Sequence, residues 1–290
     1  MSKALITESH LTDIANAIIA KGGATAPMTP AQMPAAIQAI PSGGGVRFGV
    51  GIDSFIGEII DGYYVKQSVE SEFVINEEVS VNTTDFKYLF ISNKSISKFS
   101  IHNLKDVNVS YAFQSALEGS SVENVEIHGI STGSRNGDRT FIYLCRNCKN
   151  LISANLDNTI PIAQYGFEAA FEGCTNLKKL SLKGLASTTN GLYNICKGCT
   201  NLEYVYLNNL SIASTYDFRE GAFSECSKLK AVHFDEATAI PMMYNANAFS
   251  AAPSTMKIVV PDGLYDDWII ANNWSVYASN IIKVSEYTGE

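Results

Sequence analysis

A pattern of apolar and small residues recurs between residues 67 and 260. Its clearest copy reads Phe171-Glu-Gly-Cys174-Thr-Asn-Leu177-Lys-Lys-Leu180-Ser-Leu182. With Cys174 as position zero, the unit has an apolar residue or cysteine at minus three, a small residue at zero, and apolar residues at plus three, plus six and plus eight. The same register fits zeros at Asn93, Gly119, Cys148, Cys174, Cys199, Cys226 and Ala252. Among the three plus positions of these units only Thr255 is not apolar, whereas a composition of 46% apolar residues would fill about half of them.

This spacing predicts short strands alternating with turns. Positions plus six and plus eight are two apart and share one face of a strand, whereas minus three, zero and plus three share one side of a turn or helical segment. One coil cannot bury its apolar face alone, but stacked coils form a continuous core beside a parallel sheet with strands about 4.8 Å apart. We therefore expect an α/β repeat, a solenoid over residues 67–260. A degenerate first unit begins near Gln67 and contains Phe73 and Ile75.

The residues before the solenoid predict a separate helical module. Apolar residues at positions 11, 14, 15, 18 and 19 have the spacing of a one-faced helix that ends at Gly22, and a second short helix carries Ile37 and Ile40. About forty residues bury too little surface alone, so residues 1–41 should dock onto a partner or self-associate, or alternatively pack on the rest of the chain.

The segments that flank the solenoid predict a linker and two caps. Residues 42–66 start with a flexible glycine-rich linker, and residues 46–65 fit two strands or an amino-terminal cap equally well. Residues 261–290 predict a carboxyl-terminal cap with a helix over Asp262 to Asn272. Trp268 and Trp274 are large enough to cover the last coil.

The repeated unit resembles the bacterial leucine-rich repeats of the BspA-like class. The shared phrase is an Ala-Phe or equivalent, then x-x-Cys-x-x-Leu-x-x-Leu/Val-x-Leu. The segments from Ile258 to Trp268 and from Asn273 to Ala278 are similar to the end segment that often follows such repeats. The resemblance implies a right-handed leucine-rich-repeat solenoid of a kind used mainly for adhesion and binding.

The amino-terminal residues are similar to a short module of phage and prophage tail-associated proteins. The matching phrases are Leu11-Thr-Asp-Ile14-Ala-Asn-Ala-Ile18 and Met28-Thr-Pro30-Ala-Gln-Met-Pro34-Ala-Ala-Ile37. This resemblance implies a virion protein, made in the host cytoplasm and released by lysis, that attaches to other tail or baseplate proteins through residues 1–41. The sequence leaves the oligomeric state open, and fibre-like attachment favours a homotrimer by analogy.

Charge and hydropathy argue against several classes of partner. The 290 residues carry 21 basic and 29 acidic side chains, and no cluster of Lys and Arg could neutralise phosphates. No stretch reaches the roughly 18 apolar residues of a membrane helix, and Met1 to Glu8 lacks the apolar core of a signal peptide. We expect no nucleic-acid binding, no membrane insertion, and folding in a reducing cytosol.

The six cysteines are interpreted as core residues. The Cys145/Cys148 and Cys196/Cys199 pairs have the spacing of a four-cysteine zinc site, but both fall at minus three and zero, where other units have Phe, Ala or Gly. The pairs also lie two coils apart, about 9 to 10 Å by strand spacing, too far for one zinc ion with bonds near 2.3 Å. We assign no metal and no cofactor.

The histidines and acids do not form a recognisable catalytic motif. His102 and His128 share position plus nine on adjacent units; such a pair could bind a metal or sense pH, but we favour a solvated pair at the strand end. No Ser or Cys nucleophile motif and no phosphate-binding loop is found, and paired acids such as Asp266-Asp267 have no feature that would raise a pKa. We expect a protein without catalytic activity.

The outward strand positions, plus five and plus seven, form the candidate binding surface. Tyr204, Tyr206 and His233 should make an aromatic patch flanked by Lys179, which suits sugars and protein partners. The alternative is that exposed tyrosines are simply good strand formers. The longest unit has three additional residues, which predict a surface loop with Arg135 and Arg139 as a second, weaker candidate site.

The resulting hypothesis is a non-enzymatic phage tail protein, structural or receptor-binding, that presents a leucine-rich-repeat surface to a host glycan or protein. One alternative is a bacterial adhesion or interaction protein with the same solenoid. Another is a glycan-processing enzyme, which would need two carboxylates about 5 to 10 Å apart in a cleft.

Overall fold

The computed structural model describes residues 55–60, 63–68, 71–81, 86–107, 109–129, 138–158, 165–184, 186–187, 191–208, 211–212, 218 and 220–289. The chain separates into two compact units, Met1–Gly45 and Val46–Glu290, and every described residue belongs to the second. The helical module predicted for residues 1–41 and the glycine-rich linker lie outside the described residues.

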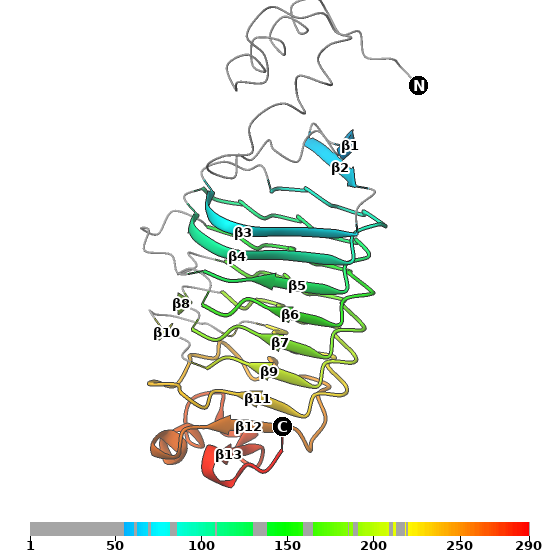
Figure 1. Ribbon diagram of the computed structural model, residues 1–290. Coiled ribbons are helices and arrows are strands. Elements are labelled where there is room, and N and C mark those ends of the chain that lie inside the picture. The colour runs from blue at the N-terminus through cyan, green and yellow to red at the C-terminus, as the bar shows by residue number, and fades with distance from the viewer. Residues whose placement is uncertain are drawn as a thin grey trace, which may run out of the picture. The chain divides into compact units, whose positions relative to one another are not determined.

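A ladder of parallel strands dominates the second unit (Figure 1). Its nine strands are, in spatial order, β3 (Glu72–Val81), β4 (Lys98–Val107), β5 (Asn124–Ile127), β6 (Ser153–Asn155), β7 (Lys179–Ser181), β9 (Tyr204–Tyr206), β11 (Ala231–His233), β12 (Lys257–Val260) and β13 (Ile281–Lys283). A second parallel pair joins β8 (Ala186–Ser187) to β10 (Ser211–Ile212). The segment that fitted two strands or a cap contains an antiparallel pair, β1 (Phe55–Ile60) and β2 (Tyr63–Ser68).

The strand register follows the repeat and confirms the predicted solenoid. Neighbouring strands pair one unit apart, as in Leu180 with Val205, and the degenerate first unit joins in because Phe73 pairs with Phe99. All residues at plus six and plus eight of the seven predicted units are buried. In the last unit Thr255 is exposed at plus three and Met256 is buried beside it, which accounts for the one exception in the pattern.

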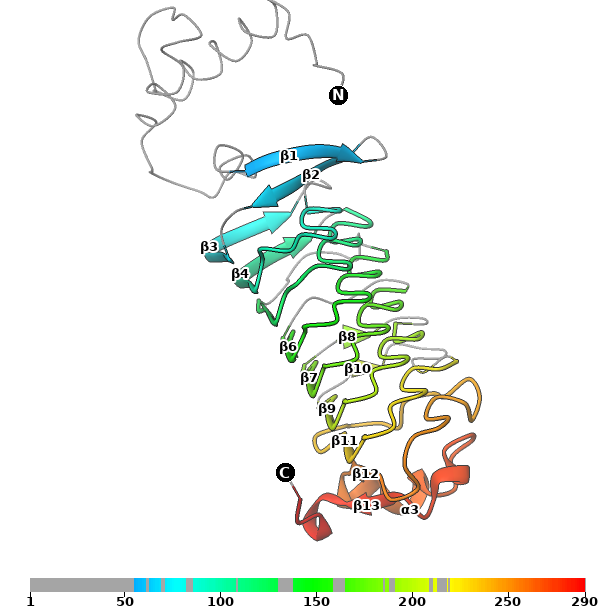
Figure 2. The ribbon, with the colours of Figure 1, turned by 90° about the vertical axis from the view of Figure 1, so that its right-hand side faces the viewer.

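The other side of each coil is a run of tight turns, not a helix (Figure 2). In one coil the N–H of Tyr143 bonds to the carbonyl of Glu168 in the next coil, whereas the N–H of Leu144 bonds back to Phe141. Left-handed residues recur in this layer, at φ 57° for Tyr143 and 61° for Asn147. Alternate amides therefore join the coils, so the turns need no helical hydrogen bonds to satisfy the buried backbone.

The left-handed residues also show that the zero position of one unit is one residue later than the sequence pattern indicates. The sequence pattern puts Gly119 at zero, but its φ of 65° and the hydrogen bond from its N–H to the carbonyl of Arg146 align it with Asn147, one residue before the zero residue Cys148. The buried small residue of this unit is Ser120, whose Oγ lies 3.6 Å from Cys148 Sγ. Because Val125 still pairs with Ala154, this unit is one residue shorter between its turn and its strand.

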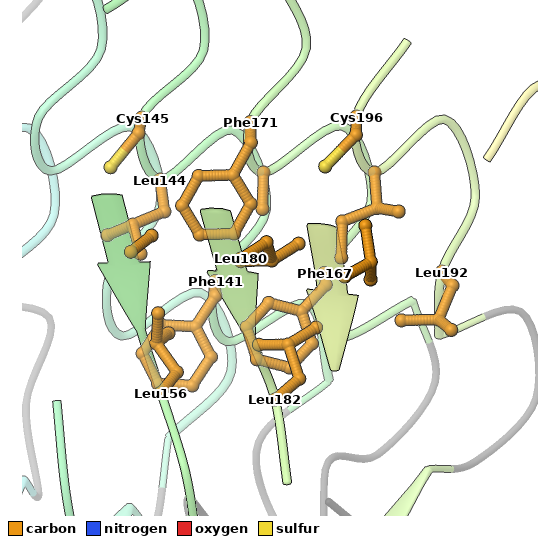
Figure 3. Close-up of a cluster of buried hydrophobic side chains, with 14 of the residues drawn as sticks. Phe141, Leu144, Cys145, Leu156, Phe167, Phe171, Leu180, Leu182, Leu192 and Cys196 are labelled. Carbon is orange, nitrogen blue, oxygen red and sulfur yellow. The ribbon is translucent and has the colours of Figure 1, made fainter. Parts of the chain in front are cut away.

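The core fills the space between the strands and the turn layer (Figure 3). Phe86, Phe113, Phe141 and Phe167 stack on successive coils, with ring centroids 4.6, 5.0 and 5.1 Å apart. All six cysteines are buried and unpaired, as expected for small core residues. The thiols at position zero also bond the coils together, since Cys174 Sγ donates to the carbonyl of Cys145 at 2.9 Å, and burial raises the pKa of Cys174.

The carboxyl-terminal residues lie against the last coil and form a shorter helix than the one expected. The helix expected over Asp262–Asn272 consists of η1 (Asp262–Leu264) and α3 (Tyr265–Trp268), followed by η2 (Ser275–Tyr277) and η3 (Val284–Glu286). Trp268 and Trp274 are fully buried against Phe234. Trp274 Nε1 donates to the carbonyl of Pro241 at 2.7 Å, so this side chain both covers the last coil and is itself hydrogen-bonded.

Candidate functional site

The structure brings the four predicted patch residues together on the outer face of the ladder. Lys179 is on β7, Tyr204 and Tyr206 are on β9, and His233 is on β11, so the residues occupy three adjacent strands. The register places Ser181 and His233 on either side of Tyr206. Both tyrosines alternate with the buried Val205 and are partly exposed.

Tyr206 is held between neighbours on both sides. Its ring stacks on the His233 imidazole, with centroids 4.7 Å apart and planes at 12°. Lys179 Nζ and Lys183 Nζ lie 4.7 and 5.1 Å from the centroid of the Tyr206 ring, in the range of cation–π contacts. The ring is therefore fixed, and the patch is more basic than the sequence indicated.

His233 is buried, which corrects its assignment to an exposed patch. Its side chain is 5% exposed, because the ring of Tyr287 meets it edge-on at 5.2 Å while Tyr206 covers it from β9. Its Nδ1 lies 3.1 Å from Asp235 Oδ1. His233 stacks against Tyr206 from the neighbouring strand, and its burial prevents direct contact with a ligand.

A third lysine completes the patch beside Tyr204. Lys230 Nζ lies 5.4 Å from the Tyr204 ring centroid and 2.5 Å from Glu203 Oε2. The hydrogen bond lowers the pKa of Glu203 and raises that of Lys230. We call the group of Lys179, Lys183, Tyr204, Tyr206 and Lys230 the tyrosine–lysine patch.

Only one of the two arginines of the second candidate site, Arg139, belongs to the described residues, and it is not near this patch. Arg135 lies outside the described residues. Arg139 belongs to the turn layer, where its Nη1 donates to Tyr111 Oη at 3.1 Å and its guanidinium lies 4.9 Å from the Tyr165 ring centroid. The hydrogen bond to Tyr111 raises the pKa of Arg139, and Glu168 lies 3.9 Å away. Arg139 thus links three coils on the face opposite the ladder.

Sequence reasoning missed Lys183, Lys230 and Tyr287. Lys183 stands at plus nine, the same position as His102 and His128, so aligning that column would have found it. Lys230 stands at plus four, just before its strand. Tyr287 follows the last repeat, and no periodic signal could place it.

One cluster of metal-ligating side chains occurs within the described part of the chain. His102, Glu126 and His128 are partly exposed, and one ligand atom from each lies within 4.8 Å of the other two. The two imidazoles face each other with centroids 6.1 Å apart. The predicted histidine pair therefore exists, and Glu126 joins it from position plus seven.

The turn layer carries an open depression of about 420 Å³. It is lined by Tyr193, Asn194, Lys197, Glu220, Gly221, Ser224, Asn247 and Ser250. Glu220 is the single carboxylate in this lining and accepts a hydrogen bond from Asn245 at 3.3 Å. The lining therefore offers no carboxylate pair of the kind that glycoside hydrolysis needs.

Comparison with known proteins yields similarity only at the level of the fold. No protein-family model matches the sequence. No curated protein matches it either. Among solved structures, a leucine-rich repeat protein from Bacteroides ovatus is 13% identical, with a TM-score of 0.34, over 75% of this chain and 67% of that one. A leucine rich cell surface protein from Faecalibacterium prausnitzii is 14% identical, with a TM-score of 0.25, over 77% of this chain and 61% of that one.

The fold is a leucine-rich-repeat solenoid. This assignment rests on the chain's own parallel ladder and on the buried leucines of its repeat, such as Leu177, Leu180 and Leu182. Within the described residues, no helix is both long and apolar enough to span a membrane.

Proposed function

We propose that the chain is a non-enzymatic binding protein whose solenoid recognises a surface glycan through the tyrosine–lysine patch. The observation that carries this proposal is the fixed arrangement of Tyr206 between His233 and Lys179 on the outer face. A rigid aromatic side chain with a polar tip binds at low entropic cost.

The charge of the patch favours a glycan with acidic groups. Three ammonium groups, those of Lys179, Lys183 and Lys230, surround two tyrosines. The ion pair with Glu203 balances the charge of Lys230, so an acidic ligand would be attracted mainly by Lys179 and Lys183. Acidic sugars would gain both hydroxyl–tyrosine hydrogen bonds and ion pairs here.

We further propose that the protein is part of a phage tail. This proposal rests on the similarity of residues 11–37 to tail-associated modules, which lies outside the described residues. In this role residues 1–41 attach to other tail or baseplate proteins and the solenoid faces the host. A bacterial adhesion protein would use the same patch, so co-sedimentation of the full chain with tail particles, against a chain lacking residues 1–41, distinguishes the two.

The test of glycan recognition measures binding of the full chain to isolated envelope polysaccharides by surface plasmon resonance. We expect saturable binding that weakens with added salt, and a loss of affinity of about tenfold or more in the Tyr204→Ala/Tyr206→Ala protein. Tyr244→Ala is the matched control, because Tyr244 is exposed and lies outside the patch. Equal binding by the double variant and the native chain would contradict the proposal, as would binding only to envelope protein.

A further inference from the structure

We propose that His102, Glu126 and His128 form a binding site for a divalent transition-metal ion, with Zn²⁺ as the best match. Two imidazoles and one carboxylate are a donor set that zinc prefers, and three protein ligands leave a coordination position for water or a partner group. The site is separate from the tyrosine–lysine patch, because β6 lies between β5, which carries Glu126, and β7, which carries Lys179.

The strand register explains why these side chains meet. His102 follows Ile101 on β4, and Ile101 pairs with Ile127 on β5, so His128 is the lateral neighbour of His102. Glu126 lies two residues before His128 and therefore shares its face. The inward neighbours Ile101 and Ile127 are fully buried, which fixes all three ligands on the outer side.

The backbone around His128 is held rigidly beside β4. The N–H of His128 donates to the carbonyl of Ile101 at 2.8 Å, and the N–H of Leu104 donates to the carbonyl of His128 at 2.9 Å. Gly129 allows this approach, because a Cβ at that position would lie 1.9 Å from the carbonyl oxygen of Leu104. Only side-chain rotation remains to be fixed when a metal binds.

The distances permit a shared ion after small rotations. Two nitrogen donors on a tetrahedral zinc lie about 3.3 Å apart when the bonds are about 2.0–2.1 Å. The three ligand atoms already lie within 4.8 Å of one another, and all three side chains are partly exposed and able to turn.

The ligand atoms of the cluster have no competing side-chain partner among the described residues. Within the described residues, no side-chain hydrogen bond or ion pair occupies His102, Glu126 or His128; the imidazole pair makes only a ring contact. Ser100 pairs with Glu126 in the register, and its buried hydroxyl has no hydrogen-bond partner in the described structure. Because this oxygen is not accessible to solvent, Ser100 is a buried neighbour of the site and not one of its ligands.

The test is titration of the full chain, free of affinity tags and chelator-treated, with ZnCl₂ by calorimetry and with CoCl₂ by absorption spectroscopy. We expect one Zn²⁺ per chain and a cobalt spectrum of nitrogen and oxygen ligation, without the sulfur-to-cobalt charge-transfer band of cysteine ligation. His102→Ala and His128→Ala should each weaken Zn²⁺ binding by at least about tenfold, since even outer-shell changes cost 10- to 100-fold.

Two matched controls separate this site from other metal-binding groups. Glu126→Gln should weaken binding, whereas Glu123→Gln, an exposed carboxylate three residues earlier, should not. His10→Ala should also leave the affinity unchanged. Absence of Zn²⁺ binding to the native chain, a thiolate band with cobalt, or unchanged affinity in a folded His102→Ala/His128→Ala protein would overturn the proposal.

Discussion

The phenylalanine stack offers a quantitative test of the layered core. Phe141 and Phe167 are fully buried on adjacent coils, with ring centroids 5.1 Å apart and planes at 13°. Truncation of either to alanine would cost about 3–5 kcal/mol, a large part of a typical folding free energy of about 5–15 kcal/mol. Leucine is the better substitution, because a hydrophobic replacement of similar size costs about 1.5 kcal/mol or less and keeps the protein folded.

The expected result is a double-mutant cycle with coupling confined to neighbouring coils. For Phe141→Leu with Phe167→Leu we expect a coupling energy of about 0.5–1.5 kcal/mol, the contribution of an aromatic pair beyond its buried area. For Phe86→Leu with Phe167→Leu we expect additivity within about 0.5 kcal/mol, because two rings lie between them. Urea unfolding followed by circular dichroism gives both values. Equal coupling in both pairs, or none in the adjacent pair, would refute the layered arrangement.

Three further predictions concern backbone fit, buried thiols and the cover over the ladder. Gly129→Ala should destabilise the fold by about 1–3 kcal/mol in urea unfolding, whereas Gly263→Ala, with open space around it, should stay within about 0.5 kcal/mol of the native chain. Burial raises the pKa of Cys226 above its ordinary value of 9.0, because the folded protein favours the neutral thiol. The thiol therefore makes its full contribution to the free energy of unfolding below about pH 9, and this contribution falls as the pH rises further. Cys226→Ala should therefore make the decline in unfolding free energy between pH 8 and 10.5 shallower, by up to about 1.4 kcal/mol per pH unit; an equal slope would contradict this. Tyr287→Ala should make His233 reactive to diethyl pyrocarbonate under native conditions. An unreactive His233 in this variant would show that Tyr287 does not shield it from solvent.

The repeat made the ladder and the core predictable. The backbone conformation of the turns could not be predicted from it. Strand positions such as Leu180 and Leu182 alternate strictly, so their burial follows from periodicity alone. The turn layer has no such period, because left-handed residues as different as Tyr143 and Asn147 serve the same role in it. The misplacement of Gly119 arose there, since sequence similarity cannot show which of two small residues takes the positive φ.

The candidate site was predictable only as far as the repeat extends. Tyr204, Tyr206 and Lys179 follow from the outward positions, and the register brought them together as expected. The burial of His233 was not predictable, because Tyr287 comes from beyond the last unit and covers it from outside the repeat pattern. Glu126 could have been added to the histidine pair, since it stands on the same outward face.

The most direct test of the binding face uses a bulky group on either side of the solenoid. All described cysteines are buried, so a maleimide–polyethylene glycol reagent should attach only to a new surface cysteine. Lys179→Cys places it on the outer face of the ladder, and Lys197→Cys places it in the turn layer, with each unlabelled variant as its control. We expect labelling at position 179 to abolish binding to envelope glycans and labelling at position 197 to preserve it. Binding that survives the label at 179 and disappears with the label at 197 would contradict it.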